Sequence, residues 1–240
     1  MHRERPSRVR GAVVWTSTPT GPGSGLVLPD GCMDLLWRSD RGEVLVAGPD
    51  TGAQAVEAAP GVTWTGLRLA PGHAPAVLGV PAAELRDTRV ALTDLWGAAA
   101  ARRVAERVAA APAAALEALA AGAAPDPALT RAAGLLASGW AVAEVADALG
   151  VGVRRLHRRS LDAFGYSPQL LGRVLRFRRA VAALRAGAPP ARVAAQAGFA
   201  DQAHLSREVR VFAGTTPGAL RQPRSANRST DPPSGSSTVA

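Results

Sequence analysis

The chain has 240 residues with a formal charge of +9 at pH 7, and 47% of its residues are hydrophobic. That content excludes a chain that is disordered throughout and predicts one large or two small domains. The one cysteine excludes an internal disulfide, and no apolar run is long enough for a signal peptide or a membrane span, so we expect a cytoplasmic protein without a membrane partner.

Positive charge is concentrated in the C-terminal part of the chain. Residues 1–127 contain 12 arginines and 13 acidic residues, whereas residues 128–221 contain 14 arginines and 5 acidic residues. A basic run is often only a solvated surface, but an excess over a whole domain favours a polyanionic partner.

The first predicted elements are short strands. The segments "GAVVWTSTP", "GLVLPDGCMDLLWRS", "GEVLVAG" and "GVTWTGLRLAPG" are rich in Val, Leu, Trp and Thr and are separated by turn residues. Their close spacing predicts a small β-sandwich or barrel within residues 1–97. Residues 75–85 are irregular to helical in pattern. An Ala-rich helical stretch over residues 95–122, interrupted at Pro112, predicts a helical linker over residues 98–127.

A repeat occupies the C-terminal part. Residues 149–168, "LGVGVRRLHRRSLDAFGYSP", align with residues 198–217, "GFADQAHLSREVRVFAGTTP", at an offset of 49 positions. The pairs at this offset are Leu156 with Leu205, Arg158 with Arg207, Gly165 with Gly214, Ser167 with Thr216 and Pro168 with Pro217. A short apolar helix that ends in glycine precedes each segment, and its matching residues, such as Val145 and Val193, are 48 positions apart. This order of short helix, turn and basic helix is the helix-turn-helix pattern, here present twice.

A long helix is predicted between the repeats. Ser167 is a suitable N-cap, Pro168 suits the first helical position, and Gly187 follows the end. A helix of about 19 residues is roughly 28 Å long, close to the ~34 Å between major-groove faces one turn apart on DNA. The sequence therefore predicts an α+β chain with an all-α domain over residues 128–222. The polar residues 223–240 predict a disordered tail.

The second repeat carries a family signature. Its segment "GFADQAHLSREVRVFAGTTPGALR" resembles the DNA-binding domain of the AraC/XylS family of bacterial transcription regulators, and the resemblance covers residues 128–221. In the first repeat, Arg159 and Ser160 stand where this family usually has an apolar and an aromatic residue, and the neighbouring Leu161, Ala163 and Phe164 can fill the space.

The N-terminal half resembles the cupin-like domain of one AraC-type branch through "LPDGCMDLLW", "VAGPDT", "GLRLAPGHAPAVLGVPAAEL" and "LTDLWG". This resemblance implies a sensing or dimerising role without identifying a ligand.

Several residues of this half allow sharper interpretations. His73 could bind a metal, but cupin sites need two or three histidines and only His2 accompanies it, so we expect no metal and no cofactor. Cys32 could be a redox sensor, although a lone cysteine on a strand is more typical of inert packing. Asp30 and Asp34 could be paired carboxylates, but a turn aspartate and an inward polar anchor are the simpler interpretation.

The family resemblance implies residues that contact DNA. In the first recognition helix these are Arg154, His157 and Arg158 at base edges, with Arg155 and Arg159 nearer the backbone. In the second they are Gln202, Ala203, His204, Ser206, Arg207 and the basic Arg210. Gln can pair with adenine, Arg with guanine, and Ala can only meet a thymine methyl. His204 could instead brace its helix against the preceding turn.

These observations predict a sequence-specific transcription regulator without catalytic activity, which inserts two helices into successive major grooves and is modulated through its N-terminal half. The alternative is a cupin-type metal-dependent enzyme fused to a DNA-targeting module, and a third interpretation makes the first half only a dimerisation scaffold. Double-stranded DNA is the expected partner. RNA polymerase, a small-molecule effector and a second copy of the chain are further partners that the resemblance leaves open.

Overall fold

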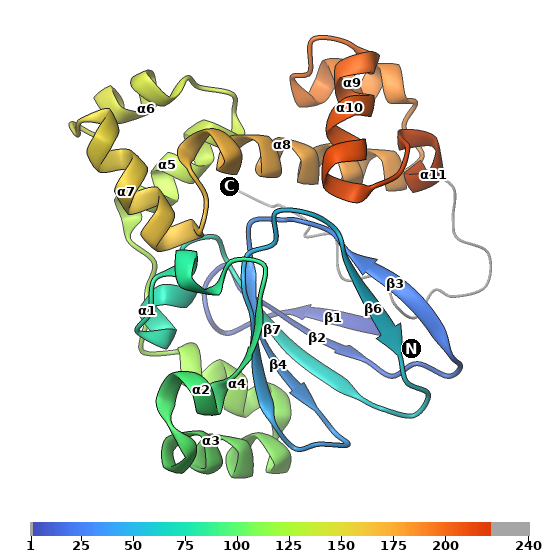
Figure 1. Ribbon diagram of the computed structural model, residues 1–240, viewed down its shortest axis with the longest axis vertical. Coiled ribbons are helices and arrows are strands. Elements are labelled where there is room, and N and C mark those ends of the chain that lie inside the picture. Colours follow the sequence, from blue (N-terminus) through green and yellow to red (C-terminus); the bar gives the residue numbers. More distant parts are fainter. Residues whose placement is uncertain (1, 222–240) are drawn as a thin grey trace.

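The computed structural model describes residues 2–221, which form a β-rich N-terminal half and a helical C-terminal half (Figure 1). Each half has its own apolar core, one built from residues between 9 and 120 and the other from residues between 129 and 213. The predicted fold class, an antiparallel β unit followed by an all-α domain, is confirmed. The tail predicted over residues 223–240 lies outside the described residues.

Within the described residues, eight antiparallel strands form two sheets. The larger sheet has the order β1 (His2–Pro6), β2 (Val13–Ser17), β7 (Trp64–Leu69), β4 (Met33–Arg38), β5 (Val44–Ala47) and β8 (Arg89–Ala91). Strands β3 (Gly23–Val27) and β6 (Gln54–Ala58) pair with each other in the smaller sheet.

The two faces of the larger sheet differ in chemistry because side chains alternate along each strand. One face carries Leu35 and Leu67, which are fully buried in the apolar core. The other face carries Trp15, Asp34 and Arg68, and the indole Nε1 of Trp15 donates a 2.9 Å hydrogen bond to Asp34. A polar group therefore lines one side of a sheet whose other side is apolar.

Helices cover the apolar face. They are α1 (Ala74–Leu78), the 3₁₀ helix η1 (Ala82–Leu85), α2 (Leu92–Trp96), α3 (Ala98–Ala110) and α4 (Pro112–Ala120). The predicted helical stretch is present with its break before Pro112, because proline suits the first turn of a new helix. Val104 and Val108 of α3 and Leu116 of α4 are buried in the same core as the sheet. The segment predicted as a linker is thus part of the N-terminal core.

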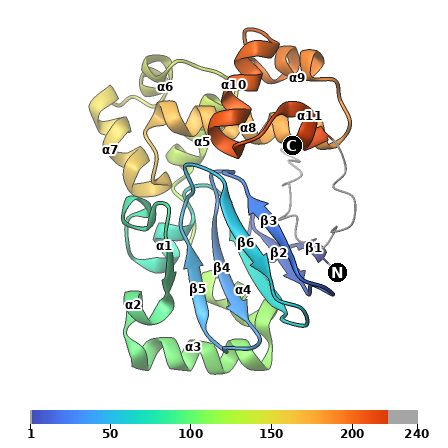
Figure 2. The ribbon, with the colours of Figure 1, turned by 45° about the vertical axis from the view of Figure 1, so that its right-hand side comes forward.

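The helical half contains α5 (Pro127–Ala137), α6 (Val142–Ala148), α7 (Val153–Phe164), α8 (Pro168–Arg185), α9 (Pro190–Ala197), α10 (Gln202–Ala213) and α11 (Pro217–Arg221). Helix α8 begins as predicted, with the hydroxyl of Ser167 accepting a 3.2 Å hydrogen bond from the backbone N–H of Leu170. Figures 1 and 2 show α8 crossing the domain, with α6 and α7 at one end and α9 and α10 at the other.

Candidate nucleic-acid interface

The two repeats have the same local structure. Helices α6 and α7 form the first helix-turn-helix unit, and α9 and α10 form the second. Leu156 and Leu205, which match in sequence, are both buried in the core, and the matching Gly165 and Gly214 both end their helices with a left-handed φ, of 72° and 64°. The offset seen in the sequence is therefore a structural equivalence.

Most of the residues predicted to contact DNA lie on the outer faces of α7 and α10. The exposed ones are Arg154, Arg155, His157 and Arg158 of α7 and Gln202, Ala203, Arg207 and Arg210 of α10. The remaining three, Arg159, His204 and Ser206, are half-buried. Helix α8, which joins the two units, has 18 residues and is therefore about 27 Å long.

Two polar residues of α10 are partly engaged within the protein. The Nδ1 atom of His204 accepts a 3.3 Å hydrogen bond from the backbone N–H of Ala200, and its ring meets Phe199 edge-on. The hydroxyl of Ser206 donates to the carbonyl oxygen of Gln202 at 2.9 Å. His204 therefore braces the turn of its own unit, and only its Nε2 atom remains to face a partner.

The first repeat accommodates its two unusual residues in different ways. Ser160 is buried, and its hydroxyl donates a 2.8 Å hydrogen bond to the carbonyl oxygen of Tyr166. Arg159 turns to the start of α5, where it pairs with Asp126. Arg159 is thus committed to an ion pair, whereas the sequence places it near the DNA backbone.

The second recognition helix is held against α8 by an ion pair. Two guanidinium nitrogens of Arg173 donate to the two carboxylate oxygens of Glu208 at 3.1 and 2.8 Å, and Glu208 is only 8% exposed. The same guanidinium lies over the ring of Phe212. A two-point contact of this kind fixes the rotation of α10, because both partners must keep their orientation.

The two recognition helices also expose apolar side chains, which the sequence interpretation did not include. Val153 is 47% exposed and Val211 is 59% exposed. The repeat indicated the outward position of Val153, since Val153 aligns with Gln202, a predicted DNA contact, at the offset of 49 positions.

The N-terminal half docks on the first unit. Phe164 of α7 packs on Gly72, where a Cβ atom would lie 2.8 Å from the ring, so this contact needs glycine. The equivalent positions in the second unit hold the pair Phe212–Ala213 instead of Ala163–Phe164, and Phe212 packs inward on Phe177 with ring centroids 5.1 Å apart. A shift of one position thus turns the aromatic side chain of the first unit toward the N-terminal half.

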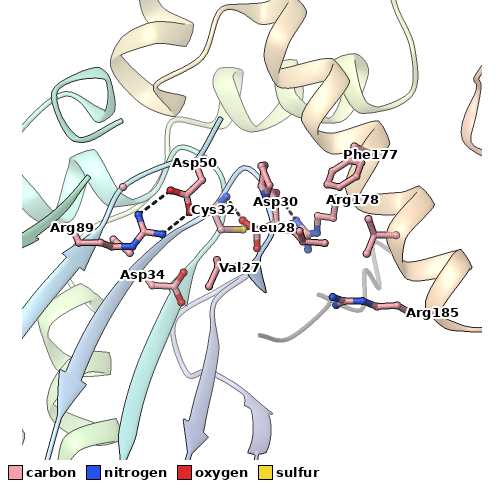
Figure 3. A pocket seen from close by; sticks show the side chains of 14 residues that line it. Val27, Leu28, Asp30, Cys32, Asp34, Asp50, Arg89, Phe177, Arg178 and Arg185 are labelled. Carbon is pink, nitrogen blue, oxygen red and sulfur yellow. Dashed lines mark hydrogen bonds and ion pairs between the residues drawn. The ribbon is translucent and has the colours of Figure 1, made fainter. Parts of the chain in front are cut away.

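A pocket lies beside this junction, between the sheet and α8 (Figure 3). Its cavity volume is about 70 Å³. The wall from the N-terminal half includes Asp30, Asp34 and Asp50, and the wall from α8 includes Arg178 and Arg185. Asp30 and Asp34 were candidates from the sequence, but the sequence did not predict that they face α8.

Cys32 and His73, the candidate redox and metal-binding residues, are both buried. The backbone N–H of Cys32 donates to Asp30 at 2.8 Å, as in a turn, and burial raises the pKa of the Cys32 thiol far above its ordinary value. His73 is buried, with Nε2 2.9 Å from the carbonyl oxygen of Ala123. Within residues 2–221, no group of three or more His, Cys, Asp or Glu side chains is arranged to hold a metal ion. No helix in this range is long and apolar enough to cross a membrane.

Two equivalent helix-turn-helix units on a connecting helix define a DNA-binding protein, and the family comparison agrees. Residues 129–223 match a family described as a helix-turn-helix domain, and residues 12–91 match a domain of unknown function. The predicted AraC-type helix-turn-helix domain is confirmed by this match over residues 129–223, and the match supports a DNA-binding transcription regulator. No curated protein is significantly similar to the chain in sequence.

Solved structures resemble the chain in fold. ToxT from Vibrio cholerae is 9% identical with a TM-score of 0.50, and the match covers 88% of this chain and 97% of ToxT. The C-terminal domain of AraT, a response regulator from Geobacillus stearothermophilus, is 24% identical with a TM-score of 0.39 over 44% of this chain and 93% of that domain. The ToxT match shows that both halves together follow a known architecture.

Proposed function

We propose that the chain regulates transcription by inserting α7 and α10 into successive major grooves on one face of DNA. The observation that supports this most directly is the structural equivalence of the two units, which present exposed basic side chains from matching positions such as Arg158 and Arg207. The length of α8, about 27 Å, is close to the ~34 Å between groove faces one turn apart.

The two helices read different bases in this proposal. On α7, Arg154 and Arg158 are four positions apart and share a face, so both can donate to guanine, with His157 beside them and Arg155 nearer a phosphate. The asymmetric chemistry of the two helices requires an asymmetric operator.

On α10, Gln202 suits adenine, Arg207 suits guanine, and Ala203 suits a thymine methyl group. Arg210 lies one turn beyond Arg207 and suits a phosphate. The hydroxyl of Ser206 retains its acceptor capacity, so it can take a bond from a base amino group.

The N-terminal half modulates this binding through its contact with the first unit. Phe164, the last residue of α7, and Tyr166, in the connection between α7 and α8, both contact the N-terminal half. Any change in the N-terminal half that shifts these contacts therefore reaches the recognition helix directly. Sedimentation of the intact chain tests whether this half also forms a homodimer.

A comparison of two arginines tests whether α10 reads bases. Arg207 and Arg179 are both exposed, but Arg207 lies on α10 and Arg179 on the connecting helix. On a site selected from random DNA, Arg207→Ala should cost about 1 to 3 kcal/mol and relax the preference at one base pair. Arg179→Ala should weaken selected and random DNA by similar factors, or leave both unchanged.

The measurement is a competition titration of both variants against the selected site and each of its single-base variants. A uniform loss of affinity across that panel for Arg207→Ala would rule out base reading by this residue.

A further inference from the structure

The pocket between the sheet and α8 contains ionised groups that the DNA-binding proposal does not use. Figure 3 shows Asp34 and Arg89 on the side of the sheet, while Arg178 and Arg185 extend from α8 toward them. The pocket therefore has one wall in each half of the chain. Whatever fills it touches both the N-terminal half and the helix that joins the two reading units.

Two of the three aspartates on the wall have contacts within the protein at both carboxylate oxygens. Both carboxylate oxygens of Asp50 accept from Arg89, at 2.9 and 2.6 Å. One oxygen of Asp30 accepts the backbone N–H of Cys32, and the other lies 3.6 Å from the Nε of the buried Arg68. These pairs balance one another and leave little capacity for a ligand.

Asp34 and Arg178 retain such capacity. The Oδ1 atom of Asp34 accepts from Trp15 and lies 4.0 Å from Arg68, whereas its Oδ2 atom has no hydrogen-bond partner in the described part of the chain. The Nη1 atom of Arg178 makes only long contacts, 3.5 Å to the carbonyl oxygen of Asp30 and 3.8 Å to the sulfur of Cys32. The pocket thus offers an acceptor on the sheet, Asp34, and a donor on α8, Arg178, beside the further cation Arg185.

We propose that this pocket binds a small amphoteric molecule of the size of glycine or alanine, whose ammonium group donates to Asp34 and whose carboxylate accepts from Arg178. A ligand with one charge only would leave the other partly buried group without a ligand partner while shielding it from water, which costs free energy. The volume, about 70 Å³, accommodates roughly five to seven water-sized groups, since one water needs about 10–15 Å³ of such accessible space.

The ligand also links the two halves of the chain. Arg178 lies on α8 about one turn from Val174, which is buried in the core of the helical domain. A ligand that binds Arg178 can therefore shift α8, the helix that sets the spacing of α7 and α10. The ligand therefore shifts the DNA affinity, by about five-fold or more in the usual range of such coupling. This step rests on the proposed function, whereas ligand binding itself does not.

Calorimetric titration of the full chain with glycine, L-alanine and L-serine tests the site. Ethylamine and propionate serve as probes that carry only one of the two charges. We expect saturable binding of at least one amphoteric probe and none of the single-charge probes. Arg178→Gln and Asp34→Asn should each weaken binding about 10- to 100-fold, because a charge-assisted hydrogen bond is lost.

Two matched variants control for a general effect of charge. Arg179→Gln removes the neighbouring exposed arginine of α8, and Asp40→Asn removes an exposed aspartate after β4, so both should bind the probe as the unchanged chain does. Arg178→Gln keeps the test decisive if Asp34→Asn fails to fold, since Arg178 is only partly buried.

Three results would overturn the site: no amphoteric probe binds, ethylamine or propionate binds as tightly, or binding persists undiminished in both pocket variants. A DNA titration with and without the bound probe then separates the two proposals. Loss of base-selective DNA binding by the unliganded chain would contradict the proposed function. Intact DNA binding with no response to the bound probe would contradict only the regulatory link.

Discussion

The hydroxyl of Tyr166 donates a 2.6 Å hydrogen bond to the backbone carbonyl oxygen of Asp50, and this bond joins the two halves of the chain. Tyr166 lies in the short connection between α7 and α8 and is fully buried. Burial raises its pKa above the ordinary value, so the hydroxyl keeps its proton and remains a donor. The side chain of the same Asp50 holds Arg89 at the wall of the pocket, so the junction and the pocket share one residue.

Replacing Tyr166 by phenylalanine should lower the free energy of unfolding by about 1 to 2 kcal/mol, because the Asp50 carbonyl stays buried without its donor. Urea denaturation measures the change. Thr130→Ala is the control, since it removes a 3.1 Å side-chain bond to a carbonyl oxygen at an exposed site and should cost no more than about 0.5 kcal/mol. An equal decrease in the free energy of unfolding for both variants would show that the bond between Tyr166 and Asp50 stabilises the chain no more than an exposed hydrogen bond does.

Glu117 should make the stability of the chain depend on acid pH. The Arg5 guanidinium, with the backbone N–H of Arg8 and the hydroxyl of Ser7, lowers the pKa of Glu117 from 4.5 to about 2. A depressed carboxyl pKa adds stability that is fully present above pH 4.5 and is lost as the pH falls toward 2.

The variant Glu117→Gln should therefore be less stable at pH 7, by about 1 to 3 kcal/mol, and its stability should change less between pH 4.5 and 2. Thermal unfolding over this pH range checks both statements. Glu106→Gln, at an exposed position of α3, should follow the unchanged chain at every pH. A parallel pH profile for Glu117→Gln would contradict the linkage.

Arg173→Gln should destabilise the second unit by about 1 to 2 kcal/mol, because it leaves the buried carboxylate of Glu208 without its two donors. The loss stays below that of a fully buried pair, since the side chain of Arg173 is 41% exposed and solvent screens the charge. Arg210→Gln on the exposed face of α10 is the matched control and should change stability by less than about 0.5 kcal/mol. Chemical denaturation followed by circular dichroism compares the two.

Binding of DNA by the intact chain should weaken steeply with salt. With about six to ten phosphate contacts, the affinity should fall roughly 10³- to 10⁵-fold between about 50 and 200 mM salt. Fluorescence anisotropy at a series of salt concentrations gives the slope. A flat response would mean that the basic C-terminal part does not neutralise phosphates, and it would point to a protein partner.

The sequence predicts the helical half closely because its signals are local. Ser167 caps α8, as the Ser-Pro pair predicts. The offset of 49 positions pairs the buried Leu156 with the buried Leu205 and the exposed Arg158 with the exposed Arg207. Helix ends and buried stripes depend on residues a few positions apart, so a single sequence contains them.

The N-terminal half is predicted less completely because its contacts are distant in sequence. Strand β1 is a charged edge strand, His2–Pro6, without the alternating apolar residues that predict a strand, and the short β6 has only one β-branched residue, Val56, to indicate it. Arg68 offers no sequence signal for its burial among Glu4, Asp30 and Asp34, since that arrangement exists only once the strands are aligned. The pocket depends in addition on α8, more than 100 residues further along the chain.

A helix-turn-helix unit that occurs twice in one chain can gain a second contact without losing its fold when its large aromatic side chain is shifted by one position along the helix. In α10 Phe212 packs on Phe177 of the connecting helix α8, within the helical half, whereas in α7 Phe164 also packs on Gly72 of the N-terminal half. The first unit thus contacts the N-terminal half in addition to carrying a proposed recognition helix. The second unit keeps its aromatic contact inside the helical half and depends on α8 for it.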